Sequence, residues 1–156
     1  MIGLNILDIK DFTEKLFKEE TFDNFLVTEA DFATSFSVSV NGRIAEPEEE
    51  DDFITWRTLR PLAFQIIKGK QLPRSFKIVL KLSKENKTKT VTSMGLPFTA
   101  DDVAGLFLNI RYEDKKIMCV TGCSMNTFTM DKSVEKEWDG FIRRFLRHHQ
   151  IPVEEG

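Results

Sequence analysis

Residues 105–122, GLFLNIRYEDKKIMCVTG, contain two alternating runs of apolar and polar side chains joined by a short polar stretch. In the first run the apolar side chains stand at every second position: Leu106, Leu108, Ile110 and Tyr112. Successive side chains of a strand point to opposite faces, so this period of two predicts a β-strand with one covered face. The stretch from Glu113 to Lys116 then predicts a tight turn, followed by an antiparallel return strand from Ile117 to Thr121. The chain must therefore build an antiparallel sheet whose one face packs against other elements.

The elements that cover this face are expected to be helices. The clearest is a final helix, whose apolar positions repeat at intervals of three and four residues: Val134, Trp138, Phe141, Ile142, Phe145 and Leu146. An earlier helix follows a cap at Asp8 and should end near Glu20. Another carries an apolar stripe from Leu59 to Ile67, with Gly69 as its C-terminal cap. A weaker helix is expected after Ser83, because KENKTKTVTSMG lies between strands although its threonines disfavour a helix.

Further strands are expected at residues 2–6, 25–40, 76–83 and 126–130. The Asn-Gly pair at Asn41 and Gly42 is typical of a hairpin turn. Thr99 to Asp102 matches a capping box that opens one helical turn. The order of elements predicts an α+β fold, a largely antiparallel sheet with helices packed on one face. A duplicated strand-helix-strand-strand unit, as in clamp-like folds, is one way to generate that order.

The length of the chain favours one domain, residues 1–156, since folded chains tend to split only beyond about 250 residues. The N-terminus has no cationic leader before its apolar run, which breaks at Asp8, and no stretch approaches the ~20 apolar residues of a membrane span. Cys119 and Cys123 would be about 13 Å apart on one straight strand, which is too far for a disulfide, although a turn at Gly122 would shorten this separation. Reduced thiols and a cytoplasmic location are therefore expected.

The net charge of −3 conceals a strong partition along the chain. Residues 1–52 contain 14 acidic and 4 basic side chains, with an acidic surface loop expected near 44–53, whereas residues 53–84 contain 8 basic side chains and no carboxylate. The candidates for anion or nucleic-acid contact are Arg57, Arg60, Lys68, Lys70, Arg74 and Lys77. Trp56 and Phe64 could stack on bases. Alternatively these cations face the acidic N-terminal half, within the domain or across a dimer, and the slightly negative total charge favours that interpretation.

No familiar catalytic pattern is complete in this sequence. Gly69 and Lys70 lack the upstream glycine and the following Ser or Thr of a P-loop, and they stand between a helix and a strand in the wrong order. Ser133 and Lys136 form an S-x-x-K pair without its companion elements, so Ser133, or Asp131 before it, is expected to cap the final helix. The two adjacent histidines near the C-terminus diverge on a helix and cannot chelate one metal. We therefore expect no cofactor, no metal site and no catalytic residue.

Three segments carry a resemblance to a known family: FQIIKGKQLPRSFKIVLKLS, GLFLNIRYE and TGCSMNTFTMDKSVEKEWDGFIRRFL. Together they resemble an uncharacterised family of short proteins from Clostridia and other Firmicutes, a domain of unknown function, and the resemblance covers nearly the whole chain. It implies a cytoplasmic bacterial protein and supplies no activity, ligand or site residue.

A local resemblance links GLFLNIRYEDKKIMCVTGCSMNTFTMD and FKIVLKLSKEN to DNA sliding-clamp domains. Such clamps contain duplicated units and line their DNA channel with basic helices. This chain departs from that pattern, because it has room for one such domain and its first helix mixes Lys10 and Lys15 with Asp11 and Glu14.

The sequence as a whole favours a non-catalytic binding or protein-interaction module of a bacterial cytoplasm, capable of self-association and not bound to a membrane. Two alternatives remain open at this point. One is a nucleic-acid-binding protein that uses residues 53–84, and the other is an enzyme with a dispersed active site.

Overall fold

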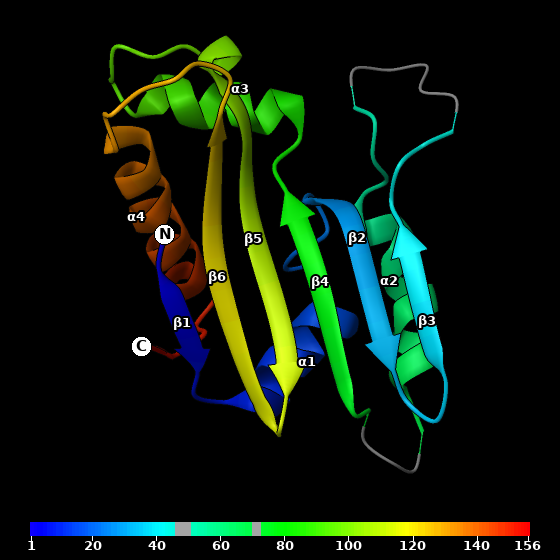
Figure 1. The fold of residues 1–156 in the computed structure, drawn as a ribbon. Helices are drawn as coiled ribbons and strands as arrows, with labels where there is room; N and C mark the ends of the chain where they lie inside the picture. The colour runs from blue at the N-terminus through cyan, green and yellow to red at the C-terminus, as the bar shows by residue number, and fades with distance from the viewer. Residues whose placement is uncertain (46–50, 70–72) are drawn as a thin grey trace.

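The computed structural model describes residues 1–45, 51–69 and 73–156. It contains a seven-stranded sheet in the order β3-β2-β4-β5-β6-β1-β7, and every neighbouring pair of strands is antiparallel (Figure 1). The strands are β1 (Gly3–Ile6), β2 (Leu26–Ala33), β3 (Ser37–Asn41), β4 (Ser75–Lys81), β5 (Val103–Glu113), β6 (Lys116–Met125) and β7 (Val153–Glu155). The helices are α1 (Ile9–Phe17), α2 (Trp56–Ile67), α3 (Lys84–Ser93) and α4 (Ser133–His148), with a 3₁₀ turn η1 (Ala100–Asp102).

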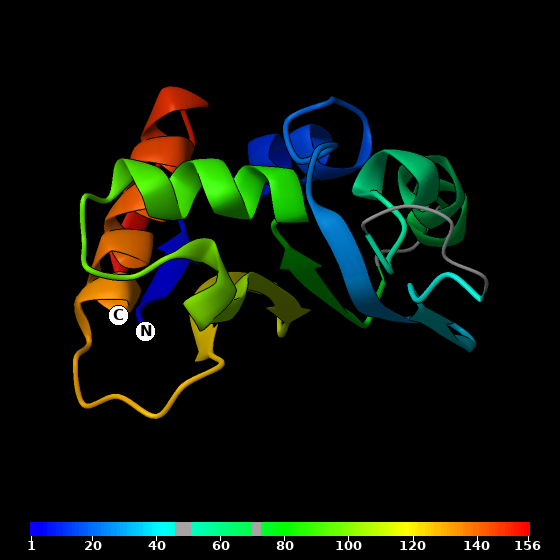
Figure 2. The same ribbon diagram turned by 90° about the horizontal axis from the view of Figure 1, so that it is seen from above.

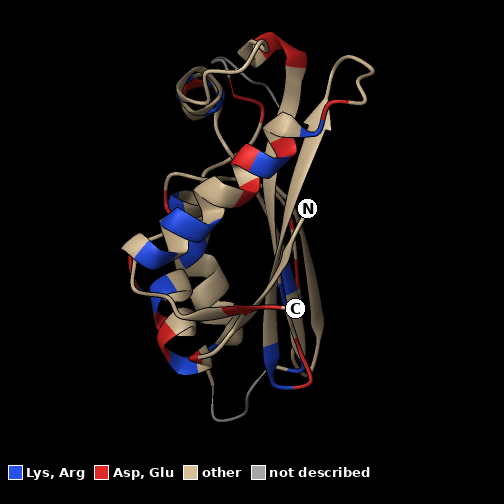
Figure 3. Ribbon diagram, turned by 90° about the vertical axis from the view of Figure 1, so that its left-hand side faces the viewer, with Lys and Arg blue, Asp and Glu red and all other residues tan. Residues whose placement is uncertain are grey.

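The four helices lie on one side of the sheet, as Figure 2 and Figure 3 show. Side chains alternate along the central strands, so every second one is buried under the helices, as with Ile78 and Leu80 on β4. The side chains between them belong to the opposite face, which we call the open face; Lys77 and Arg111 lie on it. The expected α+β fold, an antiparallel sheet with helices on one face, is confirmed.

The β5–β6 hairpin forms as the alternating pattern predicts. Glu113 pairs with Lys116, and the two residues between them, Asp114 and Lys115, have φ angles of 52° and 61°. Positive φ at both central positions matches the twist of the flanking strands in a two-residue hairpin turn.

The Asn-Gly pair does not form a hairpin turn, so that prediction is wrong. The β2–β3 turn lies earlier, where Ala33 pairs with Ser37 and Thr34 N–H donates to Phe36 C=O at 2.8 Å. Gly42 instead lies directly against β2, where an added Cβ would be 1.8 Å from the carbonyl oxygen of Val27. The glycine is needed for this close approach of two backbones rather than for a turn.

Most helix starts follow the expected capping chemistry. Asp8 accepts a hydrogen bond from Asp11 N–H at 3.1 Å, although α1 ends at Phe17 and not near Glu20. The weak helix α3 is confirmed, with Ser83 as its N-cap. The predicted C-terminal cap of α2, Gly69, is off by one residue, because the cap residue is Lys68.

The capping box at Thr99 is confirmed, and of the two residues proposed to cap α4 the structure selects Asp131. Thr99 N–H donates to Asp102 Oδ2 at 2.8 Å, as a capping box requires. At α4, Ser133 is the first helical residue and donates its N–H to Asp131 Oδ1 at 2.8 Å, so Asp131 has the capping role.

The chain after β5 differs from expectation in two places. Residues 126–130 form no strand, because β6 continues to Met125 and Asn126 then bonds the η1 turn through Asp101 C=O at 2.8 Å. The short strand β7 was not predicted. The expected acidic loop near 44–53 lies partly at residues 46–50, outside the described residues.

The order strand-helix-strand-strand does occur twice, as β1-α1-β2-β3 and as β4-α3-β5-β6. The two units have different places in the sheet. β1 lies between β6 and β7, whereas β4 lies between β2 and β5.

Candidate functional site

The cations of residues 53–84 are distributed over several surfaces. Arg57 and Arg60 both lie on α2 and face Asp23, a carboxylate with 1% exposure. Arg60 makes a bidentate pair with it, since its Nε and Nη2 donate to Oδ1 and Oδ2 at 2.8 and 3.0 Å. These hydrogen bonds raise the pKa of Arg60. The pair fixes α2 to the segment between α1 and β2, so Arg60 has an intramolecular partner in the acidic half of the chain.

The remaining candidates do not join these two arginines. Lys77 lies on the open face, where its Nζ is 3.1 Å from Glu29 Oε1. Lys68 follows the last residue of α2, Arg74 precedes the first residue of β4, and both are exposed. Lys70 lies outside the described residues. The described candidates thus occur on different elements and faces. A nucleic-acid interface made by them stays a prediction.

The expected stacking residues have other environments. Trp56 is fully buried, and its Nε1 donates to Leu16 C=O at 2.8 Å. Phe64 is half-buried and lines a groove on the helix side of the sheet.

This groove is a mainly apolar hollow on the surface of the described residues. It lies between α1 and α2, at the end of the sheet where β4 begins and β5 ends, and has a volume of about 550 Å³. Its lining comes from α1, from α2, from Pro73 and from the ends of β4 and β5 with the turn beyond: Ile9, Lys10, Thr13, Glu14, Phe17, Lys18, Phe64, Ile67, Pro73, Phe76, Tyr112 and Lys115. Small-molecule sites in proteins are typically apolar hollows of 300–1,000 Å³ with a few polar groups at defined positions.

Helix α1 supplies two parallel rows of the lining because residues four apart lie above one another on a helix. The inner row consists of Ile9, Thr13 and Phe17. The hydroxyl of Thr13 donates to Ile9 C=O at 2.6 Å, so the groove side of this row is apolar in character. The outer row consists of Lys10, Glu14 and Lys18, all exposed.

The floor of the groove is aromatic. Tyr112 stacks on Phe76 with ring centroids 5.2 Å apart, and Phe76 meets Phe17 edge to face at 5.3 Å. Phe17 in turn lies against Trp56 at 5.8 Å. The groove therefore opens directly onto the packed core.

The rim of the groove carries an excess of positive charge. Lys10 and Lys18 of α1 and Lys115 of the β5–β6 turn line it, against one carboxylate, Glu14. Lys18 Nζ lies 5.7 Å from the ring centroid of Phe64, which places its ammonium over the aromatic wall. An apolar cleft with a cationic rim suits a ligand that has an apolar body and an anionic head group.

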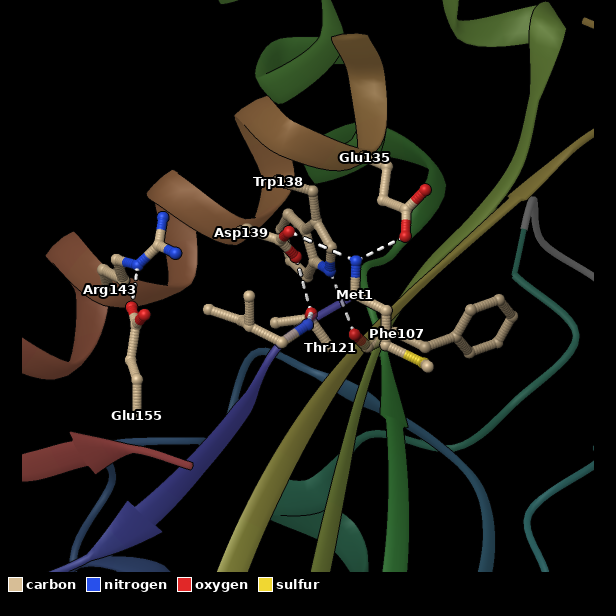
Figure 4. Close-up of polar contacts among 9 residues, drawn as sticks. Met1, Phe107, Thr121, Glu135, Trp138, Asp139, Arg143 and Glu155 are labelled. Carbon is tan, nitrogen blue, oxygen red and sulfur yellow. Dashed lines mark hydrogen bonds and ion pairs between the residues drawn. The ribbon is translucent and has the colours of Figure 1, made fainter. Parts of the chain in front are cut away.

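A polar cluster occurs on the same helix side of the sheet but towards its β7 edge, where α4 covers β1 and β6 (Figure 4). Asp139 is buried, and its Oδ1 accepts from the hydroxyl of Thr121 at 2.6 Å while its Oδ2 lies 3.2 Å from the N-terminal ammonium of Met1. Glu135 also bonds this ammonium, and that contact raises the pKa of the amine and lowers the pKa of the carboxyl group. Ile2 N–H completes the network by donating to Thr121 Oγ1 at 2.9 Å. These groups bond one another, and their effect is to fix α4 to the sheet.

Two neighbouring contacts in Figure 4 have the same effect. Trp138 Nε1 donates to Phe107 C=O at 2.9 Å, and Arg143 pairs with Glu155 of β7.

The two cysteines are free thiols. Burial raises the pKa of Cys119 to about 12 and also raises the pKa of the half-buried Cys123, so neither is an activated thiolate. In the described part of the chain, no group of three or more His, Cys, Asp or Glu side chains is arranged to hold a metal ion. No described helix has the length and hydropathy that crossing a bilayer requires.

The groove was not predicted from the sequence. The one signal available was the spacing of Lys10, Glu14 and Lys18 beside the apolar row of the same helix. That signal shows an amphipathic helix and does not show what faces it.

A family model described as "Family of unknown function (DUF5721)" matches residues 15–154. No curated protein and no solved structure matches the chain.

Proposed function

The chain belongs to a family of unknown function (DUF5721), and from that premise we propose that it is a non-catalytic binding module whose site is the groove between α1 and α2. The ligand is a single-chain amphiphile with an anionic head, such as a fatty carboxylate. Its apolar chain lies against Phe17, Phe64 and Tyr112, and its head group meets the lysines of the rim.

The observation that carries this proposal is the combination of an apolar hollow of about 550 Å³ with three lysines and one glutamate at its margin. Burial of the apolar chain would supply the affinity, at roughly 25 cal/mol per Å² removed from water. The lysines would select for an anion and would add less, because exposed charges are screened. The volume and lining refer to the described residues; residues 70–72, between Gly69 and Pro73, are not among them.

We propose a bacterial cytoplasm as the location. Two free cysteines, one of them fully buried, are compatible with a reducing compartment.

Isothermal titration calorimetry with dodecanoate, below its micelle concentration, tests the binding proposal. We expect saturable binding of one dodecanoate per chain. Dodecyltrimethylammonium, which has the same chain and a cationic head, should bind at least about tenfold more weakly, a difference of ~1.4 kcal/mol.

Two groove variants have matched controls elsewhere on the molecule. Thr13→Phe fills the groove and should weaken dodecanoate binding about tenfold or more. Thr88→Phe is its control, because Thr88 makes the same hydrogen bond to the carbonyl four residues earlier but is exposed on α3.

Lys115→Glu tests the charged rim and should weaken dodecanoate binding by a few fold, because the attraction of the head group is lost. Its control is Lys89→Glu on α3, which should leave the affinity unchanged.

Absence of saturable binding, or equal affinities for Thr13→Phe and Thr88→Phe, would contradict the proposal. Equal affinities for dodecanoate and dodecyltrimethylammonium would show that the groove binds apolar chains without selecting the head group. The proposed role of the rim lysines would then be wrong.

A further inference from the structure

The two edges of the sheet differ in length and in charge. β7 contains three residues, of which Glu154 and Glu155 are acidic, and Glu155 pairs with Arg143 of α4. β3, at the other edge, contains the five residues Ser37–Asn41, and none of them is charged. Short length and charged side chains are common protections of an edge strand against pairing with another strand. β7 has both protections, and β3 has neither.

The hydrogen bonds of β3 show which of its backbone groups face outward. Gly42 N–H donates to Thr28 C=O at 3.1 Å, one residue beyond the pair that Asn41 makes with β2. In an antiparallel ladder this bond makes Asn41 a non-hydrogen-bonded position, and such positions alternate along the strand. The N–H and C=O groups of Ser37, Ser39 and Asn41 therefore point away from β2. Within the described residues β2 alone pairs with β3, so these groups form a free row of donors and acceptors.

The side chains of β3 are compatible with a second β3. The sequence SVSVN has nearly the same pattern in both directions about Ser39. In an antiparallel pairing centred on Ser39, Val38 of one copy faces Val40 of the other, and Ser37 faces Asn41. Valine thus meets valine on the helix side, polar side chains meet on the open face, and no like charges oppose one another.

We propose that β3 pairs antiparallel with β3 of a second copy of this chain, with Ser39 at the two-fold axis, so that the two sheets become continuous. Ser39 of each copy exchanges both N–H···O=C bonds with Ser39 of the other, and Ser37 and Asn41 bond each other across the axis. The half-buried Val38 and Val40 lose further exposure at the same time. Because β7 is protected, assembly stops at a dimer and does not continue into a fibre.

Sedimentation equilibrium of the full chain over a wide range of concentrations tests this inference. The unmodified chain should fit a monomer–dimer equilibrium. Ser39→Pro removes the outward N–H at the axis and leaves the ladder to β2 intact, so it should weaken dimerisation about tenfold or more. Ser39→Ala, its matched control, keeps the N–H and should dimerise as the unmodified chain does.

Ser39→Glu gives a second, independent variant. It places two carboxylates opposite each other at the axis, beside Asp31, which is the Cα partner of Ser39 within each chain. It too should weaken dimerisation about tenfold or more, and circular dichroism should show that its fold is retained. Ser124→Lys, a charge added to an exposed serine of the interior strand β6, should leave the dimer unchanged.

A chain that is monomeric at every concentration would overturn the inference, and so would a dimer that persists in both Ser39→Pro and Ser39→Glu. Dodecanoate binding does not involve β3, so the affinity of Ser39→Pro for dodecanoate separates a failure of this inference from a failure of the groove proposal.

Discussion

Neighbouring residues at one end of β4 and β5 belong to two different surfaces. Phe76 and Tyr112 point to the helix side and form the floor of the apolar groove. Lys77 and Arg111, each adjacent to one of them in sequence, lie on the open face. They help to line a second hollow of about 390 Å³, whose lining is half polar and which Phe76 and Tyr112 also reach. The acidic side chains Asp31 and Glu113 line the same hollow, so its charges balance.

The difference shows how one strand register produces two surfaces with different roles. The helix-side residues are at once the floor of the candidate site and part of the core, so changes there affect both binding and stability. The open-face residues are exposed to water and contribute little to stability. Predictions about the two faces therefore differ in size, and they are given below from the largest to the smallest.

Phe76→Ala should lower the free energy of unfolding by about 4 kcal/mol. Phe76 is 4% exposed and contacts the rings of Phe17 and Tyr112, so its removal leaves a cavity where three aromatic side chains meet. Urea denaturation followed by circular dichroism measures the change. A loss below about 1 kcal/mol would mean that the groove floor is not part of the core.

Arg60→Ala should cost about 3 kcal/mol, because it leaves the carboxylate of Asp23 buried without its bidentate partner. Arg143→Ala on α4 is the matched control. Arg143 pairs with Glu155, but both side chains are well exposed, and we expect a loss of about 0.5 kcal/mol or less. Equal losses in the two variants, again by urea denaturation, would contradict the structural role given to the Asp23–Arg60 pair.

Cys119, on the helix side of β6, should make stability fall at alkaline pH. Its pKa is about 12 in the folded chain against 9.0 for an ordinary thiol, so the unfolded chain loses this proton first. The stabilising difference is fully present below pH 9 and declines as the pH rises from 9 towards 12, by about 1.4 kcal/mol per unit. Cys119→Ala removes this contribution, so the stability difference between the two proteins should narrow from pH 8 to pH 10. A difference independent of pH would show that the thiol is not desolvated as described.

Lys77→Ala should have the smallest effect, about 0.5 kcal/mol or less. The Lys77–Glu29 pair is exposed on the open face, where water and salt screen it. A loss comparable with that of Arg60→Ala would mean that the open face is covered by something that excludes water. Measurement of the unmodified chain and of Lys77→Ala at low and high salt checks this point.

Most of the individual helices and strands could be predicted from the sequence, but the way in which they pack against one another could not. The β5–β6 hairpin, α1 and α4 could be predicted because period and capping are local properties. The groove could not, because it depends on which helix meets which strand end across residues far apart in the chain. Phe17 is a buried core residue that also lines the groove, and the sequence contained nothing to show this second role.

The misleading patterns had specific physical causes. Asn41 and Gly42 have the composition of a hairpin turn, yet Gly42 is required by the close approach of β2. The basic stretch suggested one surface, but a helix and a strand distribute its cations over two faces, and Arg60 meets a carboxylate from the acidic half. For Arg60, the favoured interpretation of the charge partition was that this cation faces the acidic N-terminal half, and its pair with Asp23 agrees with it. β7 was missed because three residues are too few for a pattern.

Methyl NMR spectroscopy during a titration with dodecanoate tests the central claim most directly, because it reads both faces of the sheet in one experiment. The methyl signals of Ile9 and Ile67, which line the groove, should shift progressively and saturate. Those of Val79 and Val120, which lie on the open face, should remain in place. Shifts confined to the open face, or no saturable shift at Ile9 and Ile67, would contradict the assignment of the groove as the binding site.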